Sequence, residues 1–321
     1  MRRILLIKTS SLGDVVHNLP VVADIAAARP DVTVAWVVEE AFAAVPRLHP
    51  RVSQVLPVAV RRWRRALWRP AVWGEMRSFI SELRAQDYAA VIDTQSLLKS
   101  AWIAAAARGV SHGLDRQSSR EPLGFFYDHT HHVPWGQHAV ERNRQLAAQS
   151  LGYTLSAPAQ YGIAAAAQTF AWLDAGRPHA VLLHATSAER KLWPEERWIE
   201  LGKMLTTQGI SSVLPWGTAV EHERSLCLAQ QIPQSVVPER LDLAALAALL
   251  AQARVVIGTD TGLTHLAGAL GVATVGIYCA TDPAATGLHA CARGVNLGGI
   301  GSPPAVGEVI AAVDEMVNGK W

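Results

Sequence analysis

Short apolar runs alternate with longer helix-like runs along most of the chain. The strand-like runs of the first half lie at 3–7, 33–38 and 89–93, and the helix-like runs lie near 15–28, 72–85 and 97–108. Runs such as ATVGIY and RVVIGTD are apolar on both faces, as are parallel strands that helices cover on both sides. This alternation predicts a doubly wound α/β sheet with right-handed crossovers.

The pattern fades between 156 and 177, where Ala, Gly and Gln dominate, and then restarts. The later strand-like runs lie at 179–185, 211–217, 254–260 and 273–279, and helix-like runs lie at 194–209, 221–232, 241–253 and 261–271. A chain of 321 residues with 50% hydrophobic content has room for two domains of about 150 residues. We expect two Rossmann-like domains, 1–165 and 166–321, with a ligand in the cleft between the carboxyl ends of their sheets.

Composition and missing motifs narrow the function. The net charge of +2 gives no general basic field for nucleic acid. The three cysteines form no CxxC pair, which fits neither a disulfide framework nor a zinc site and favours the reducing cytoplasm. Charged or polar residues break every long apolar run, so we expect no membrane-spanning segment. No GxGxxG follows a strand-like run, and GxxxxGK[ST] and HExxH are missing, which disfavours a dinucleotide oxidoreductase, a P-loop enzyme and a zinc protease.

Two further patterns are ambiguous. GVSHG at 109–113 matches GxSxG, but an alanine-rich helix-like run precedes it where a nucleophile turn needs a strand, so we expect Ser111 to be a loop residue. The segment DHTHHVPWGQH contains four histidines whose spacing matches no common metal site. These are His129, His131, His132 and His138. We expect surface or anion-facing histidines and no metal.

The segment KTSSLGDVVHNLP, at 8–20, joins the first strand-like run to the first helix-like run, where phosphate-binding turns often lie. It has a single glycine and places the acidic Asp14 at the helix start, which would repel a phosphate. An N-cap is the common role of such an aspartate. A catalytic carboxylate is the less common alternative.

The segment HATSAERKLWP, at 184–194, suits a phosphate better. Thr186 and Ser187 offer hydroxyls, and Lys191 offers a mobile cation before a helix start. Ordinary capping and a loop lysine explain the same residues equally well.

The segment TDTGLTHLAGALG, at 259–271, begins a helix directly after a strand-like run. The amides of Thr261 and Gly262 would point at a diphosphate, where the helix dipole favours an anion. His265 follows one turn later on the same helical face. Asp260 is equally typical of an N-cap, and His265 of a core residue, but together with the Thr-Gly pair they favour a binding site.

An arginine–tryptophan stretch, VRRWRRALWRP at 60–70, lies inside a region without acidic residues, 41–74. Its cations and indoles are Arg61, Arg62, Arg64, Arg65 and Arg69 with Trp63 and Trp68. A solvated cationic face is the ordinary interpretation. The missing counter-charges weaken that interpretation, because a bound polyanion or an anionic membrane surface would supply them.

Taken in this order, these segments resemble the ADP-heptose:lipopolysaccharide heptosyltransferases, and SSLGD and AVRRWR are most similar to the heptosyltransferase I branch. Further matching segments are WVVEEAFAAVP, VIDTQSLLKSA, SSREPL, QHAVERNRQL and LPWGTAVEHER, so the resemblance covers most of the chain. It implies a GT-B fold, with the acceptor on the domain 1–165 and the nucleotide sugar on 166–321. It also implies that the last helix, 304–318, packs back on the first domain.

The resemblance implies inverting transfer of L-glycero-D-manno-heptose from ADP-heptose to the Kdo region of Kdo-lipid A, without cofactor or metal. The enzyme would be cytoplasmic and peripheral on the inner membrane. Heptosyltransferase II, a transferase for another nucleotide sugar, and a non-catalytic nucleotide-sugar-binding protein remain as alternatives.

Individual roles follow from the same resemblance. Asp14 matches the proposed general base, and Lys191 would neutralise charge on the leaving diphosphate. The donor residues are Thr186, Ser187 and Lys191 for the phosphates, Glu221 for the ribose, Leu241 for the adenine, and Asp260, Thr261, Gly262 and His265 for the diphosphate and heptose. The residues expected to face the acceptor are Ser10, Ser11, Arg61, Arg62, Arg65, Arg120 and His138.

Overall fold

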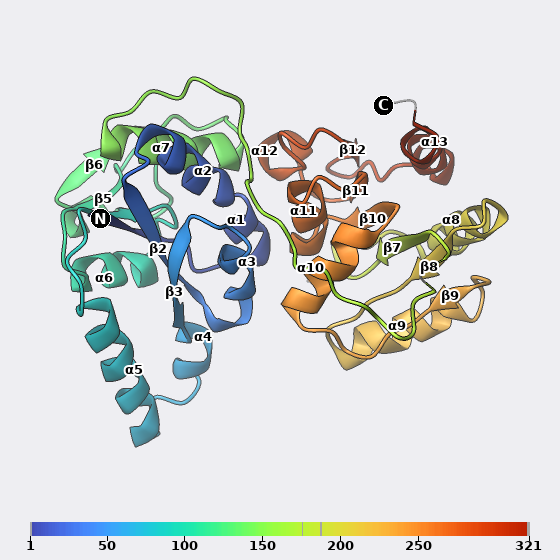
Figure 1. Cartoon of the computed structure of the whole chain (residues 1–321), viewed down its shortest axis with the longest axis horizontal. Helices are drawn as coiled ribbons and strands as arrows, with labels where there is room; N and C mark the ends of the chain where they lie inside the picture. The colour runs from blue at the N-terminus through green and yellow to red at the C-terminus, as the bar shows by residue number, and fades with distance from the viewer. Residues whose placement is uncertain (1, 175, 187, 320–321) are drawn as a thin grey trace. The chain divides into compact units, whose positions relative to one another are not determined.

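The computed structural model describes residues 2–174, 176–186 and 188–319. The chain divides into two compact units, Met1–Ile163 and Ala164–Trp321, and each has its own six-stranded parallel sheet (Figure 1). The division falls within the region 156–177, where the sequence periodicity fades.

The sheet of the first unit has the strand order β3-β2-β1-β4-β5-β6. Its strands are β1 (Arg2–Ile7), β2 (Val32–Glu39), β3 (Val52–Val58), β4 (Ala90–Asp93), β5 (Ser111–Leu114) and β6 (His129–His131). The chain starts at the centre and winds outward in both directions, which is the Rossmann arrangement that the strand–helix alternation predicts. The central strand β1 is buried from Ile4 to Ile7 because helices cover both faces of the sheet.

The helices of the first unit are α1 (Leu12–Val16), α2 (Leu19–Ala28), α3 (Ala44–Arg47), α4 (Val60–Trp63), α5 (Pro70–Leu83), α6 (Leu98–Ala106) and α7 (Ala139–Leu151), with short 3-10 turns η1 (Glu40–Phe42) and η2 (Gly124–Phe126). The single helix expected at 15–28 is two helices. Pro20 lies in the first turn of α2 and has no amide hydrogen to donate to the preceding turn, so α1 ends before it.

The sheet of the second unit has the strand order β12-β11-β10-β7-β8-β9, the same winding pattern. Its strands are β7 (His179–Leu183), β8 (Ser211–Val213), β9 (Ser235–Val236), β10 (Val255–Thr259), β11 (Thr274–Tyr278) and β12 (Gly294–Gly298). Its helices are η3 (Glu189–Lys191), α8 (Glu195–Thr207), α9 (Ala219–Ala229), α10 (Leu243–Gln252), α11 (Gly262–Ala269), α12 (Pro283–Thr286) and α13 (Val306–Val317).

Two expectations about individual elements need correction. Ser111 begins strand β5 and is not a loop residue, and its hydroxyl donates to the Asp128 carboxylate at 2.8 Å. The last helix, expected at 304–318 against the first domain, is α13 of the second unit. It buries Val309 and Val313 in the core around β10, β11 and α8, because this apolar face matches the covering layer of its own sheet.

Candidate active site

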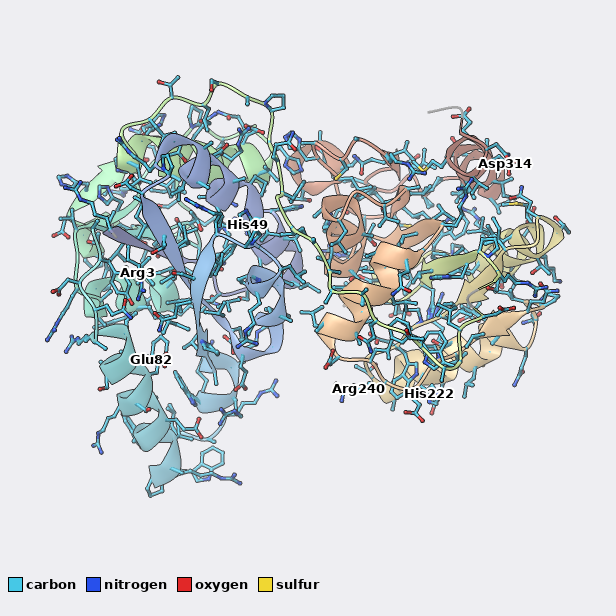
Figure 2. The ribbon with its side chains drawn as sticks, viewed as in Figure 1. Arg3, His49, Glu82, His222, Arg240 and Asp314 are labelled. Atoms are coloured by element: carbon cyan, nitrogen blue, oxygen red, sulfur yellow. The ribbon has the colours of Figure 1, made fainter. Side chains whose placement is uncertain are left out.

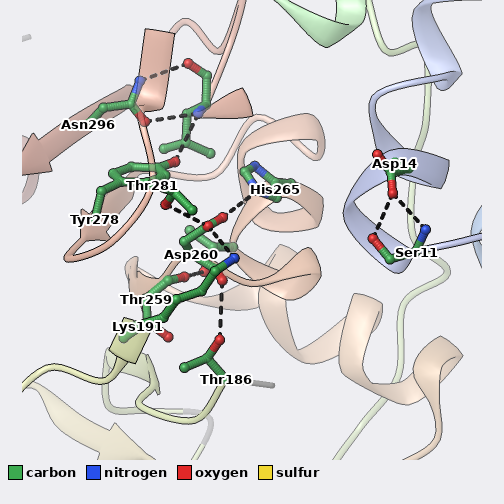
Figure 3. A network of polar contacts seen from close by, with 12 residues as sticks. Ser11, Asp14, Thr186, Lys191, Thr259, Asp260, His265, Tyr278, Thr281 and Asn296 are labelled. Atoms are coloured by element: carbon green, nitrogen blue, oxygen red, sulfur yellow. Dashed lines mark hydrogen bonds and ion pairs between the residues drawn. The ribbon is translucent and has the colours of Figure 1, made fainter. Parts of the chain in front are cut away.

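The carboxylate of Asp260 is the centre of a polar cluster at the carboxyl end of β10 (Figure 3). Lys191 Nζ and Thr281 Oγ1 each lie 2.7 Å from Asp260 Oδ2, and His265 Nε2 lies 3.4 Å from Oδ1. Lys191 comes from η3, after β7, and Thr281 follows β11. Parallel neighbours β7, β10 and β11 therefore bring three separate segments to the same edge of the sheet.

The surroundings of Asp260 keep it ionised. Burial alone would raise the pKa of this carboxyl, but the hydrogen bonds from His265, Lys191 and Thr281 outweigh burial and hold the pKa well below its ordinary value. The carboxylate of Asp260 therefore holds the Lys191 ammonium in place through a 2.7 Å ion pair.

The start of α11 lies against the loop that follows β7. The Thr186 hydroxyl donates to the Asp260 main-chain carbonyl at 3.4 Å, and the Thr259 hydroxyl lies 3.2 Å from the Ala185 carbonyl. The helix begins at Gly262, with Thr261 as its N-cap in extended backbone geometry. The first amides of α11 are thus presented next to Thr186, which is the geometry that anions use at helix N-termini.

A pocket of about 380 Å³ opens beside this helix start. Four of the expected donor residues line it, namely Thr186, Glu221, Leu241 and Thr261. Its volume lies in the range of roughly 300–1,000 Å³ that small-molecule sites occupy. Lys191, Asp260 and His265 form the neighbouring polar cluster, to which Thr186 is hydrogen-bonded through the Asp260 carbonyl.

Glu221 is positioned by the start of α9. Its carboxylate accepts hydrogen bonds from the amides of Gly217 at 2.7 Å and Thr218 at 3.1 Å, and the Thr218 hydroxyl accepts from the Glu221 amide at 3.3 Å. This reciprocal capping box fixes the carboxylate at the pocket wall. Glu221 is therefore both a helix cap and an acidic group available to a hydroxylated ligand.

Trp216 and Arg240 also line this pocket, and sequence reasoning did not single them out. Figure 2 labels Arg240 and His222 in the second unit. The Trp216 ring stacks on His222 with centroids 4.2 Å apart, and its indole N–H donates to the Pro238 carbonyl. Both residues follow short strands, β8 and β9, so their position at strand ends was the available signal. Thr281 had the same signal, since it follows β11. Ser187, an expected phosphate contact, lies outside the described residues.

In the first unit, Asp14 lies in the first turn of α1, directly after the loop that follows β1 (Figure 3). Its carboxylate accepts hydrogen bonds from the Ser11 amide at 2.7 Å and the Ser11 hydroxyl at 2.8 Å. Ser11 is the N-cap of α1 and Asp14 is its third residue. The two residues form a capping box, in which the Asp14 carboxylate accepts from the N-cap residue. The N-cap interpretation of Asp14 is therefore wrong in detail, although the carboxylate does satisfy the helix start.

Two lysines that sequence reasoning missed support this turn. Lys8 is buried, and its ammonium donates to the Thr94 carbonyl at 2.5 Å and to Asn143 at 3.3 Å. Lys99 donates to Ser10 Oγ at 2.6 Å. Burial lowers the pKa of both lysines, and the charge of Asp14 opposes that effect in each. The two ammonium groups and the Asp14 carboxylate therefore attract one another.

Gln95 fixes the backbone of the same turn. Its side-chain carbonyl accepts hydrogen bonds from the amides of Thr9 and Ser10, each at 3.0 Å. Gln95 follows β4, the neighbour of β1. Adjacent strand ends thus hold Ser10 and Ser11 where the turn presents Asp14.

One cation of the arginine–tryptophan stretch has counter-charges, although the sequence led us to expect none. Arg62 forms ion pairs with Glu40 at 3.1 Å and Glu75 at 2.8 Å, both just outside the region without acids. The chain folds η1 and α5 against α4 and brings these carboxylates close. Arg61 lies over the Phe42 ring at 5.4 Å. Arg65 and Arg120 are exposed.

His138 is a helix cap in this structure. It is buried, and its Nδ1 accepts a hydrogen bond from the Val140 amide at 3.2 Å at the start of α7. Its ring meets the His17 ring edge-on at 5.2 Å. His131 stacks on His112, whose pKa burial lowers to about 4. Among the described residues, no group of three or more His, Cys, Asp or Glu side chains is arranged to hold a metal.

Comparison with known proteins places these sites in a family. The model of glycosyltransferase family 9 (heptosyltransferase) matches residues 76–306. Lipopolysaccharide heptosyltransferase 1 of Pseudomonas aeruginosa is 48% identical over 290 residues, which are 89% of this chain and 81% of that protein.

Two solved structures extend the comparison. The Escherichia coli heptosyltransferase WaaC with ADP is similar with a TM-score of 0.90 and 41% identity, over 98% of this chain and 99% of that chain. The same enzyme with ADP-2-deoxy-2-fluoro heptose gives a TM-score of 0.84 and 38% identity, over 99% and 100% of the two chains. These similarities and the two doubly wound sheets confirm the expected GT-B fold class. The chain therefore belongs to glycosyltransferase family 9, the heptosyltransferases.

Proposed function

We propose that this enzyme transfers L-glycero-D-manno-heptose from ADP-heptose to the Kdo region of Kdo-lipid A, with inversion at the sugar carbon, in lipopolysaccharide core biosynthesis. The observation that carries this proposal is the second-unit pocket next to the Lys191–Asp260 pair and the start of α11. The names of the relatives, lipopolysaccharide heptosyltransferase 1 and WaaC with an ADP-heptose analogue, support the choice of donor and reaction.

The donor would bind with its nucleoside in the pocket and its diphosphate toward Lys191. Leu241 supplies an apolar wall for the adenine, and Glu221 supplies an acceptor for the ribose hydroxyls. Lys191 and the first amides of α11, at Thr261 and Gly262, stabilise the charge that grows on the departing ADP. Asp260 holds Lys191 in position, and Thr281 and His265 hold Asp260.

Asp14 is the proposed general base. The acceptor hydroxyl must lose a proton as its oxygen attacks the heptose carbon, and a carboxylate within hydrogen-bond reach can take that proton. Ser10, Ser11 and Gly13 shape the turn, and Lys99 supports it through its hydrogen bond to Ser10. The proposed base belongs to the first unit, and the groups that stabilise the departing ADP belong to the second.

The acceptor is an anionic lipid, so the enzyme must work at a membrane face. In the described part of the chain, no helix has the length and apolarity to cross a membrane. We propose peripheral attachment to the cytoplasmic face of the inner membrane through Arg61, Arg65 and the neighbouring cations, with Arg62, Arg120 and His138 toward the acceptor. Vesicles with and without phosphatidylglycerol test this. Binding that is equally strong to both would contradict the electrostatic part.

An ADP-release assay with ADP-heptose and Kdo-lipid A tests the function itself. We expect ADP release that depends on both substrates. ADP release only with an already heptosylated acceptor would favour heptosyltransferase II, release with another nucleotide sugar would change the donor, and donor binding without any release would indicate a non-catalytic binding protein.

A further inference from the structure

The first unit contains an apolar pocket of about 370 Å³ that the proposed transfer chemistry does not use. Its lining residues come from β3 and from the helices α4, α5 and α6 or the segments next to them. Its walls include Trp63, Phe79, Ile80, Ile103 and Ala106. The volume is in the range of roughly 300–1,000 Å³ typical of ligand sites. A pocket with so few polar atoms suits a hydrocarbon better than a peptide, whose backbone would lose its hydrogen bonds there.

Exposed apolar side chains surround the mouth of this pocket. Trp102 and Leu67 line it and are 63% and 45% exposed. The Trp73 indole donates to the Leu67 carbonyl at 2.9 Å. On the other side, the Trp102 ring meets Phe126 at 5.4 Å, and the 81% exposed Phe125 lies 4.4 Å from Phe126. A continuous apolar rim of this kind marks an interaction surface.

Two cations complete the mouth. Arg64 and Lys99 are the charged residues that line the pocket, and no acidic side chain does. Within the described residues Arg64 and the adjacent Arg65 form no ion pair, in contrast to Arg62. Lys99 also donates to Ser10 Oγ at 2.6 Å, in the turn that carries Asp14. The apolar pocket, its cations and the Asp14 turn are therefore contiguous within one unit.

We infer that this pocket binds an acyl chain of the lipid acceptor, with Arg64 and Lys99 holding the anionic head group beside Asp14. The inference rests on the proposed function, because the proposed acceptor is an acylated anionic lipid. Charge complementarity at the mouth and contact with the Asp14 turn favour the acceptor over other lipids. The pocket would align the head group by anchoring its tail.

Two substitutions and a matched control test this in the ADP-release assay. Ala106→Phe fills the pocket from the end of α6, and Trp102→Ser removes its exposed wall. Trp135→Ser is the control, since Trp135 is half exposed in the same unit and does not line the pocket. For Kdo-lipid A, we expect KM to rise about tenfold in both test variants. For a deacylated Kdo head group and for ADP-heptose, KM should stay unchanged.

Equal changes in KM for the acylated and deacylated acceptors would overturn the inference, because the substitutions would then act on the head-group site. Unchanged KM for both acceptors in both variants would overturn it as well. An equal rise in KM for Kdo-lipid A in Trp135→Ser would also count against the inference, because the loss of an exposed tryptophan outside the pocket would then have the same effect.

Calorimetric binding of dodecyl phosphate, with one chain and one anionic head, tests the pocket without any turnover. We expect the wild-type enzyme to bind it and Ala106→Phe to lose at least tenfold in affinity. If no variant transferred heptose to any acceptor, the proposed function would fail, while this binding result would still decide whether the pocket holds a lipid chain. No binding by the wild-type enzyme would overturn the inference.

Two other occupants give distinct results. If the pocket serves the bilayer in general, Trp102→Ser will weaken binding to acceptor-free phosphatidylglycerol vesicles by the same factor as it raises KM, which would overturn an acceptor-specific site. If a second copy of the chain covers this face, sedimentation will show a dimer that Trp102→Ser dissociates, which would overturn it too. We expect vesicle binding and oligomeric state to be unchanged by Trp102→Ser.

Discussion

Replacing Lys191 by Met separates the structural and catalytic roles of the Lys191–Asp260 pair. In the wild-type enzyme the ammonium lies 2.7 Å from Asp260 Oδ2, and the lysine side chain is 21% exposed. Removing one partner of a fully buried ion pair costs about 3–5 kcal/mol. Here Asp260 keeps Thr281 and His265 as partners, so we expect a loss of about 1–3 kcal/mol in the free energy of unfolding. Urea denaturation with linear extrapolation measures it.

The same variant should lose far more activity than stability. If Lys191 stabilises the departing diphosphate, kcat with ADP-heptose should fall by about 10²–10³-fold, as for the loss of one preorganised donor to a developing negative charge. Lys191→Arg keeps the charge and should retain part of the rate. ADP release under saturating substrate is the assay.

The double variant Lys191→Met, Asp260→Asn is the decisive control. Removing both partners leaves no unpaired carboxylate, so stability should return close to the wild-type value. Activity should stay as low as in the single variant, because the phosphate cation is still missing. Recovery of activity together with stability would refute the reasoning, since Lys191 would then act only through Asp260.

The pH dependence gives an independent check on the same pair. The pKa of Asp260 is lower in the folded enzyme than its unfolded value of about 3.9. Its contribution to stability is therefore complete above pH 4 and is lost as the pH falls below that value toward the folded pKa. The stability difference between the wild-type enzyme and Lys191→Met should be constant between about pH 5 and 8 and shrink below about pH 4. A difference that grows on acidification would contradict the ion-pair account.

Three further predictions concern other residues of the enzyme. The Asp14→Asn variant keeps a hydrogen-bond acceptor for Ser11 but cannot take a proton. Turnover should therefore fall by about 10²–10⁴-fold, while the affinity for ADP-heptose should be unchanged. Near-normal turnover would exclude Asp14 as the base. The α9 cap is tested by Glu221→Ala and Thr218→Ala, and each should lower the free energy of unfolding by about 0.5–2 kcal/mol. Only Glu221→Ala should raise KM for ADP-heptose. Equal KM values in the two variants would remove Glu221 from the donor site. Burial lowers the pKa of His184 to about 4, below its unfolded value. As the pH falls from 6.5 toward 4, the unfolded state takes up a proton first, so the free energy of unfolding decreases. Urea denaturation should show a smaller decrease for His184→Gln.

Strand–helix alternation predicted most of both sheets because their central strands are buried on both faces and read as continuous apolar runs. Edge strands were missed for the opposite reason. β6 is the exposed segment HTH, and β9 has only two residues, so neither leaves an apolar run in the sequence. The sequence did not reveal that the final helix packs on the sheet of its own unit. Its apolar face could cover either sheet, and nothing in the sequence distinguishes the two.

The site was predictable where a motif is continuous in sequence, as at 259–271, and not where the fold joins distant segments. The partners of Arg62 lie in η1 and α5, outside the local window in which counter-charges were sought. Thr281 and Gln95 act through neighbouring strands whose pairing the sequence does not reveal. The lysines around Asp14 were missed because Lys99 lies far from the turn in sequence, and because the partners of Lys8, Thr94 and Asn143, are also distant along the chain.

The most direct test of the central claim is ADP release from ADP-heptose with Kdo-lipid A, compared with the same acceptor already carrying its first heptose. Heptose transfer to the Kdo region predicts rapid release with Kdo-lipid A and little with the heptosylated acceptor. Asp14→Asn should slow the release with Kdo-lipid A by about 10²–10⁴-fold. Faster release with the heptosylated acceptor, or none with either, would contradict the account.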